Sequence, residues 1–225
     1  MGMGLAEVMQ EEREALMAEA VAAERAGAAI LPYAAVAELA DALHTPGALR
    51  RAHPVAFAAL AGARGGALVQ SCPTLGYRML WVHADNDHYR DDYELYLRTC
   101  RGHAGGALPD SHHVDHLFNR ARAQRLRLSW IRAVLLPRGI NTSHGAGYEK
   151  ARTRGLVGTP ERPRTIDEVT LMKLWLVRSP RKGQPLTPEM RAHAGRMAAL
   201  FGLSPAEIEA NIRDLMAVAA FRPGG

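Results

Sequence analysis

Cysteine is scarce in this chain of 225 residues, which contains only Cys72 and Cys100. Two widely separated thiols do not supply the clustered cysteines of a zinc knuckle. A disulfide between them is one alternative, but we favour two buried free thiols, as is usual in a reducing cytosol. Any bound metal ion is therefore expected to be held by His, Asp or Asn side chains.

Long apolar runs are also missing. No stretch approaches the ~18 apolar residues that a membrane-spanning helix needs. The first residues, MGMGLAEVMQEEREAL, are acidic and amphipathic, and they lack the basic and apolar regions of a secretory signal. We therefore expect a cytoplasmic protein with no membrane partner. Because 48% of the residues are hydrophobic, the chain can bury the core of one large domain, or a compact core with a helical appendage.

Acidic residues are nearly absent between residues 119 and 164. This segment holds 11 arginines and lysines against two glutamates, a net charge of +9, although the whole chain carries only +5. Ten of these 11 residues are arginines, whose planar guanidinium groups suit phosphate oxygens. The segment therefore indicates contact with a polyanion such as nucleic acid. The alternative is an arginine-rich surface that faces only solvent.

Apolar periodicity and turn residues predict the secondary structure. Helices are expected over residues 5–27, 34–44, 54–63, 87–100, 120–127, 166–177, 188–201 and 205–219, and strands over residues 67–71, 77–84, 113–118 and 129–136. Thr187-Pro188 and the segment from Ser204 to Glu207 are helix-start signals. A turn is predicted at residues 137–139, and a linker rich in proline and arginine at residues 158–164.

This pattern predicts an α+β fold that is mainly helical. A small strand–strand–helix centre is flanked by N-terminal and C-terminal helices. We divide the chain into an N-terminal helical region (residues 1–65), an α+β core (residues 66–157) and a C-terminal helical region (residues 165–222). The three regions are also compatible with one continuous domain.

Two further patterns are interpreted as structural. Residues 83–92 are acidic, but they lack the glycine and the final glutamate of a calcium loop. Capping of the next helix by Asp85 or Asp87 is therefore favoured over metal binding. Tyr89, Tyr93 and Tyr96 share one helical face, which favours core packing over stacking on nucleic-acid bases.

Three histidines surround an aspartate in the sequence His112-His113-Val114-Asp115-His116. Asn141 and His144 follow after a second predicted strand, and another helix comes next. This order of an Asp-His pair, an Asn and a later His, on two extended segments and a helix, resembles the His-Asn-His endonucleases, which have the ββα-metal fold. The resemblance covers residues 112–152.

The resemblance implies a metal-dependent endonuclease that hydrolyses phosphodiester bonds in nucleic acid, with DNA as the expected partner. It implies that Asp115 is a metal ligand, that His116 is the general base, that Asn141 braces the site and that His144 is the second ligand. A histidine suits the base because its pKa lies near neutral pH, and a divalent cation neutralises charge on the scissile phosphate. Mixed Asp and His ligands suit Mg, Mn, Ni or Zn. The basic residues expected to hold the nucleic acid are Arg120, Arg122, Arg125, Arg138, Lys150, Arg152 and Arg154.

On a regular strand, Asp115 and His116 point to opposite faces, so they meet at one metal only if the strand ends or bulges there. Two other classes of function therefore stay open. The first is a non-catalytic nucleic-acid-binding protein that uses the arginine-rich segment of residues 119–164. The second is a protein-interaction module or another metal-binding enzyme, in which the histidines support the structure or bind zinc. The glycines of residues 139–147 also suit a loop that cradles a phosphate.

Overall fold

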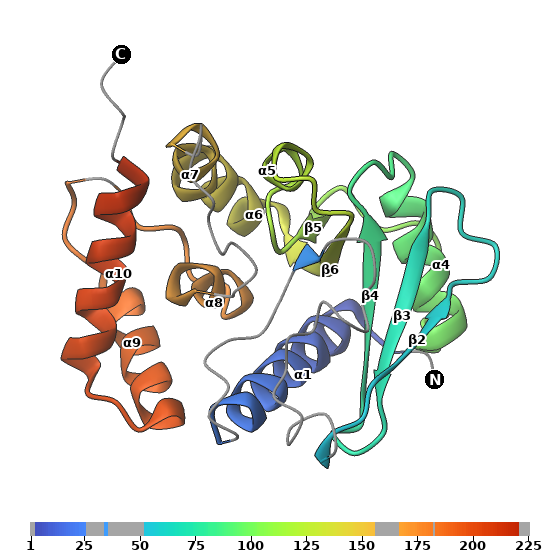
Figure 1. Cartoon of the computed structure of the whole chain (residues 1–225), viewed down its shortest axis with the longest axis horizontal. Helices are drawn as coiled ribbons and strands as arrows, with labels where there is room; N and C mark the ends of the chain where they lie inside the picture. Colours follow the sequence, from blue (N-terminus) through green and yellow to red (C-terminus); the bar gives the residue numbers. More distant parts are fainter. Residues whose placement is uncertain (1–2, 26–33, 36–51, 156–166, 182, 221–225) are drawn as a thin grey trace.

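The computed structural model describes residues 3–25, 34–35, 52–155, 167–181 and 183–220 (Figure 1). Its helices are α1 (Leu5–Arg25), α4 (Tyr89–Cys100), α5 (Arg120–Arg125), α6 (Arg138–His144), the π-helical turn η1 (Gly145–Glu149), α7 (Lys150–Gly155), α8 (Glu168–Leu174), α9 (Pro188–Phe201) and α10 (Pro205–Ala220). Its strands are β1 (Ala34–Ala35), β2 (Ala56–Ala59), β3 (Ala67–Cys72), β4 (Tyr77–His83), β5 (His112–His116) and β6 (Trp130–Pro137). The prediction of a mainly helical α+β fold is confirmed.

One antiparallel sheet organises the described residues. The strands run in the order β1–β6–β4–β3–β2, and β5 also pairs with β6. Ala133 of β6 pairs with Leu80 of β4 on one edge and with His116 of β5 on the other. The four predicted strands are confirmed as β3, β4, β5 and β6. The helical segment that starts with α6 follows β6 directly, so the end of β6 lies where sheet and helices meet.

Two buried glutamates attach α1 to the sheet. Glu19 forms a buried ion pair with Arg132 of β6 and accepts a hydrogen bond from the Gln70 amide at 2.8 Å. Glu12 accepts hydrogen bonds from the Tyr93 hydroxyl and, at 2.8 Å, from the backbone N–H of Leu135. Burial raises the pKa of Glu12 to about 7. These contacts explain why an acidic helix lies against the interior: its two buried carboxylates each have several donors.

Apolar clusters continue the core on both sides of α1. Tyr93 and Tyr96 are buried with Leu80 and Leu135, which confirms the core-packing interpretation of these tyrosines. A second cluster joins α1 and β6 to the helices α8, α9 and α10. These three helices lie together on the side of the molecule away from strand β2 (Figure 1). Among the described residues, none of the helices has the length and apolar content to cross a bilayer.

The predicted helix over residues 54–63 is wrong, because its centre forms strand β2. Residues Ala56–Ala59 pair with β3 along the edge of the sheet. The Phe57 ring lies edge-on to Trp81, with 6.4 Å between the ring centroids. Alanine-rich sequence favours a helix, but sheet pairing and this aromatic contact outweigh that weak intrinsic preference.

The predicted turn at residues 137–139 is also wrong. Helical structure begins at Arg138 and continues through α6, η1 and α7 to Gly155. The glycines of this segment indicated a loop, yet His144 and Tyr148 lie four residues apart and are both buried. Packing of this buried face offsets the low helix propensity of glycine. Most of the predicted helix over residues 34–44 and the linker at residues 158–164 lie outside the described residues.

The helix-start signals have mixed outcomes. Thr187 and Ser204 are confirmed, since their hydroxyls accept hydrogen bonds from the N–H groups of Met190 and Glu207 at 3.4 and 3.3 Å. The predicted capping of α4 is wrong. His88 precedes α4 without a side-chain cap, and Asp85 and Asp87 instead accept hydrogen bonds from Gln124 and Arg120.

Candidate functional site

Strand β5 separates the two residues expected to share a metal. It pairs regularly with β6 from His112 to His116, without a bulge, so Asp115 and His116 point to opposite faces. The His116 ring packs on Tyr89, with 4.5 Å between ring centroids. Burial, and then the nearby Arg120, lowers the pKa of His116 to about 4. His116 is therefore neutral at physiological pH and lies on the α4 side of the sheet.

On the other face of β5, Asp115 binds an ammonium group. Nζ of Lys173, from α8, lies 2.7 Å from Oδ2 of Asp115 and also contacts Oε1 of Glu149. The Lys173 side chain has no exposed area. Burial lowers the pKa of Lys173, but the two carboxylates outweigh that effect and hold the pKa above its usual value. Burial raises the pKa of Asp115 to about 7, which the Lys173 ammonium opposes.

Asn141 and His144 have separate partners as well. The Asn141 amide lies 3.3 Å from Nδ1 of His113, so it contacts a histidine that has no role in the resemblance. His144 is buried, and its Nε2 donates a hydrogen bond to the Val177 carbonyl at 2.9 Å. Burial, and then Lys173, lowers the pKa of His144 to about 3. Among the described residues, no three His, Cys, Asp or Glu side chains are grouped to hold a metal ion.

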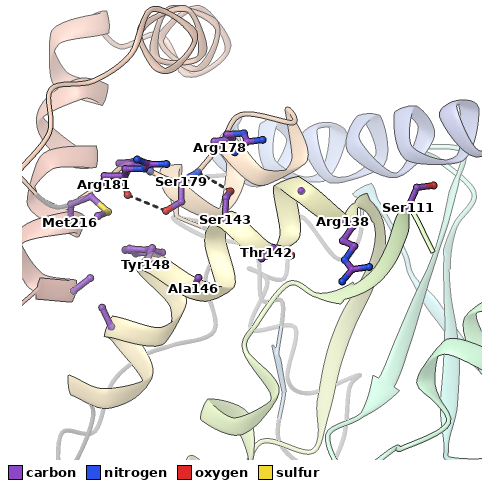
Figure 2. Close-up of a pocket in the computed structure, with 15 residues that line it drawn as sticks. Ser111, Arg138, Thr142, Ser143, Ala146, Tyr148, Arg178, Ser179, Arg181 and Met216 are labelled. Atoms are coloured by element: carbon purple, nitrogen blue, oxygen red, sulfur yellow. Dashed lines mark hydrogen bonds between the residues drawn. The ribbon is translucent and has the colours of Figure 1, made fainter. Parts of the chain in front are cut away.

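His144 and its neighbour instead position the segment that follows α8. Ser143 Oγ accepts a hydrogen bond from the Ser179 N–H at 3.2 Å (Figure 2). Together with the bond from His144 to Val177, this contact fixes the backbone on both sides of Arg178. The Arg178 side chain therefore projects from a backbone that two hydrogen bonds hold in place.

The end of α8 turns the chain into this position. The N–H of Leu176 bonds to the Lys173 carbonyl at 3.1 Å, and the N–H of Val177 bonds to the Met172 carbonyl at 2.9 Å. This pair of bonds is a Schellman motif, which places the residue after the helix in the left-handed region. Leu176 has a φ of 58° there, although glycine is the usual residue at this position.

Next to Arg178 lies a cavity of about 910 Å³ between the α6–η1–α7 segment and α10 (Figure 2). We call it the arginine cavity; its lining residues are Ser111, Arg138, Gly139, Thr142, Ser143, Ala146, Gly147, Tyr148, Ala151, Arg178, Ser179, Pro180, Arg181, Met216 and Ala219. Three of these residues are arginines and none is acidic. Arg138, Arg178 and Arg181 are exposed and form no ion pair with any carboxylate of the described part of the chain. The cavity is therefore a strongly cationic site.

The arginines and the lysine expected to bind nucleic acid have unequal surroundings. Arg138 lines the arginine cavity, and Lys150 is exposed on α7. Arg125 is exposed and donates a hydrogen bond to the Thr153 carbonyl at 3.0 Å, which places the end of α5 beside α7. These three cations are the ones that can face a polyanion.

The other predicted contacts are engaged within the protein or lie outside the described structure. Arg120 pairs with Asp87 at 2.6 Å, and Arg152 pairs with Asp167 at 2.7 Å. Arg122 is buried, with its guanidinium 4.7 Å from the Phe118 ring centroid. The side chain of Arg154 lies outside the described residues. The segment is therefore basic in composition, but only part of it is basic at the surface.

Sequence reasoning missed Arg178 and Arg181 as site residues, because they lie outside the arginine-rich segment. A signal for the cavity was present among the other lining residues, in the segment that begins at Arg138. Gly139, Ser143 and Gly147 recur every four residues, as do Thr142 and Ala146. On a helix this spacing gives a face of small side chains. The glycines among these residues indicated a loop, so this helical face was not predicted from the sequence.

Comparisons of the chain with protein-family models, with curated proteins and with solved structures found no match. Function is therefore inferred from the geometry and charge of the site itself.

Proposed function

We propose that this protein binds nucleic acid at the arginine cavity and does not cleave it. The observation that carries the proposal is the lining of the cavity, which has three arginines and no carboxylate. Guanidinium groups bind phosphate oxygens with charge-assisted, often paired hydrogen bonds. A partner with several phosphates in a row is the class of ligand that satisfies several arginines at once.

The hydrogen bonds around Arg178 favour this role. Binding costs free energy when a side chain or loop must be ordered. The backbone at Arg178 is already fixed through Val177 and Ser179, which His144 and Ser143 hold. The Nη2 atom of Arg178 also lies over Gly139, 3.9 Å from where a Cβ atom would be. The Arg178 guanidinium therefore lies close to the start of α6, next to Arg138 in the chain.

Exposed cations beyond the cavity extend the same surface. Lys150 lies on α7, one residue before the cavity residue Ala151, and Arg125 reaches the same helix through Thr153. A strand bound in the cavity can continue toward these two side chains. Long-range attraction from such a cluster accelerates association and weakens as salt is added.

Fluorescence anisotropy with a labelled 20-nucleotide DNA strand tests the proposal. We expect binding at low salt that weakens as the salt concentration rises, and loss of most of this affinity in the variant R138A/R178A/R181A. The matched control is R64A/R98A/R191A, which removes the same charge from exposed positions that do not line the cavity. Equal loss of affinity in both variants would show only a general charge effect and would contradict the proposal.

A further inference from the structure

We infer that the arginine cavity receives an unpaired segment of the nucleic-acid strand, with a base at its apolar end, rather than a duplex. The inference rests on the proposed function and names the form of nucleic acid that the same site accepts. It follows from how the charged and apolar lining residues are distributed along the cavity.

Eight of the 15 lining residues lie on one long helical segment, formed by α6, η1 and α7. Arg138 and Ala151 are the first and last of its residues in the lining. At 1.5 Å per helical residue, these two positions are about 20 Å apart. Ser111 and Arg138 lie toward one end of the cavity, Arg181 lies beside Met216 at the other, and Arg178 lies between them (Figure 2). Phosphate-binding groups are thus present at both ends of an elongated site.

One end of the cavity also has an apolar wall. Met216 and Ala219 of α10 and Ala151 of α7 belong to the lining, and α10 packs against α7. A phosphate gains nothing from such a wall, whereas the flat face of a nucleobase gains contact area there. Methionine is well suited to this contact because its sulfur is polarisable and its side chain is flexible. The combination of arginines with an apolar wall therefore matches a nucleotide with an accessible base.

The floor of the cavity is made of small residues, so a flat group can approach the helix closely. Thr142 and Ala146 are exposed, and Gly147 lies next to Ser179, whose Oγ is 3.4 Å from where a Cβ atom would be. The volume of about 910 Å³ lies within the range of roughly 300–1,000 Å³ that holds a small organic ligand. In a duplex the bases are stacked and paired inside two backbones, so no base face is available to such a site.

Binding of one sequence in two forms tests the inference. Anisotropy is measured with a labelled 12-nucleotide single strand and with a blunt hairpin whose stem contains the same sequence. We expect the single strand to bind at least about tenfold more tightly, which corresponds to about 1.4 kcal/mol. Equal affinity for both forms would overturn the inference while leaving the proposed function intact. No binding of either form at low salt would contradict the proposed function itself.

Two cavity-filling variants, A146W and T142W, test whether the preference for the single strand arises in the arginine cavity. Both positions are exposed on the helix, so a large side chain fills the cavity without entering the core. We expect each to reduce single-strand affinity to the level of the hairpin, while A146S, which adds little volume, binds as the original protein does. Single-strand affinity that is unchanged in both folded tryptophan variants would overturn the inference. Circular dichroism identifies the variants that are folded.

Discussion

The ammonium group of Lys173 lies 2.7 Å from the carboxylate of Asp115, and both side chains are buried. Glu149 contacts the same ammonium. Asp115 was predicted to bind a metal ion, but in this structure it binds the ammonium group of Lys173. The ion-paired cluster joins β5 and α8 to η1, and η1 contributes Ala146, Gly147 and Tyr148 to the lining of the arginine cavity.

Removing the lysine should destabilise the protein strongly. In K173M two carboxylates lose their shared cation, and breaking a buried ion pair in this way costs about 3–5 kcal/mol. Urea unfolding at pH 8 measures the loss. The matched control is K150M at the exposed Lys150 on α7, which should change stability by no more than about 0.5 kcal/mol.

The pH dependence of the stability lost in K173M is a second test of the same ion-paired cluster. Burial already raises the pKa of Asp115 to about 7 with the lysine present. Without the lysine, protonation of this carboxyl relieves a buried charge, so the destabilisation should be smaller at pH 5 than at pH 8. An equal loss at both pH values would contradict the assignment of the cluster as ion-paired.

Leu176 should carry backbone strain that glycine relieves. Its φ of 58° lies in the left-handed region, and its side chain is 39% exposed. Both L176A and L176G remove the side chain, but only glycine adopts this conformation without a steric cost. We therefore expect L176G to be more stable than L176A by about 1 kcal/mol, as measured by thermal or urea unfolding. If L176A is the more stable of the two, the chain does not turn at Leu176 as described.

His144 should make the protein less stable as the pH falls. Burial, and then Lys173, lowers its pKa to about 3, whereas a histidine in the unfolded chain has a pKa of about 6.5. Between these values the unfolded chain binds more protons, so stability is lost as the pH drops from about 6.5 toward 3. H144Q keeps a donor for the Val177 carbonyl but does not titrate. The stability lost between pH 7 and pH 5 should therefore be smaller in H144Q by about 2 kcal/mol. An equal loss in both proteins would contradict the neutral, buried state of His144.

The sequence predicts metal-dependent cleavage of nucleic acid. A plasmid-nicking assay tests this prediction. The four residues of the His-Asn-His resemblance have different partners. Asp115 binds Lys173 and His116 packs on Tyr89, whereas Asn141 contacts His113 and His144 bonds to Val177. We therefore expect supercoiled plasmid to remain intact with Mg, Mn, Ni or Zn ions. Nicking that D115N and H116A both abolish would contradict binding without cleavage and would support the endonuclease interpretation.

Most of the secondary structure could be predicted because hydrophobic periodicity is a local signal. The helix at residues 205–219 and the strand at residues 77–84 follow from spacing alone and need no knowledge of their partners. Strand β2 could not be predicted in this way, since alanine-rich residues 56–59 are extended only because β3 pairs with them. The helix after Arg138 was missed for a similar reason, as the packing of His144 and Tyr148 is a tertiary effect.

The site was harder to predict than the fold. The chemistry of Asp115 depends on Lys173, which lies far along the chain within a run of apolar residues. The alternation of side chains on β5 was correctly identified as the test of the metal site, but whether the strand would bulge was not readable from the sequence. Arg178 joins the cavity only because the chain turns at Leu176. Contacts between distant segments therefore decide which polar residues meet.

The salt dependence of single-strand binding tests the central claim most directly. Each phosphate contact contributes a slope of about −0.7 to the plot of log affinity against log salt concentration for a single strand. If Arg138, Arg178 and Arg181 each contact one phosphate, R138A/R178A/R181A should reduce the magnitude of this slope by about 2, and R64A/R98A/R191A should leave it unchanged. The same slope in the cavity variant and the original protein would contradict nucleic-acid binding at the arginine cavity.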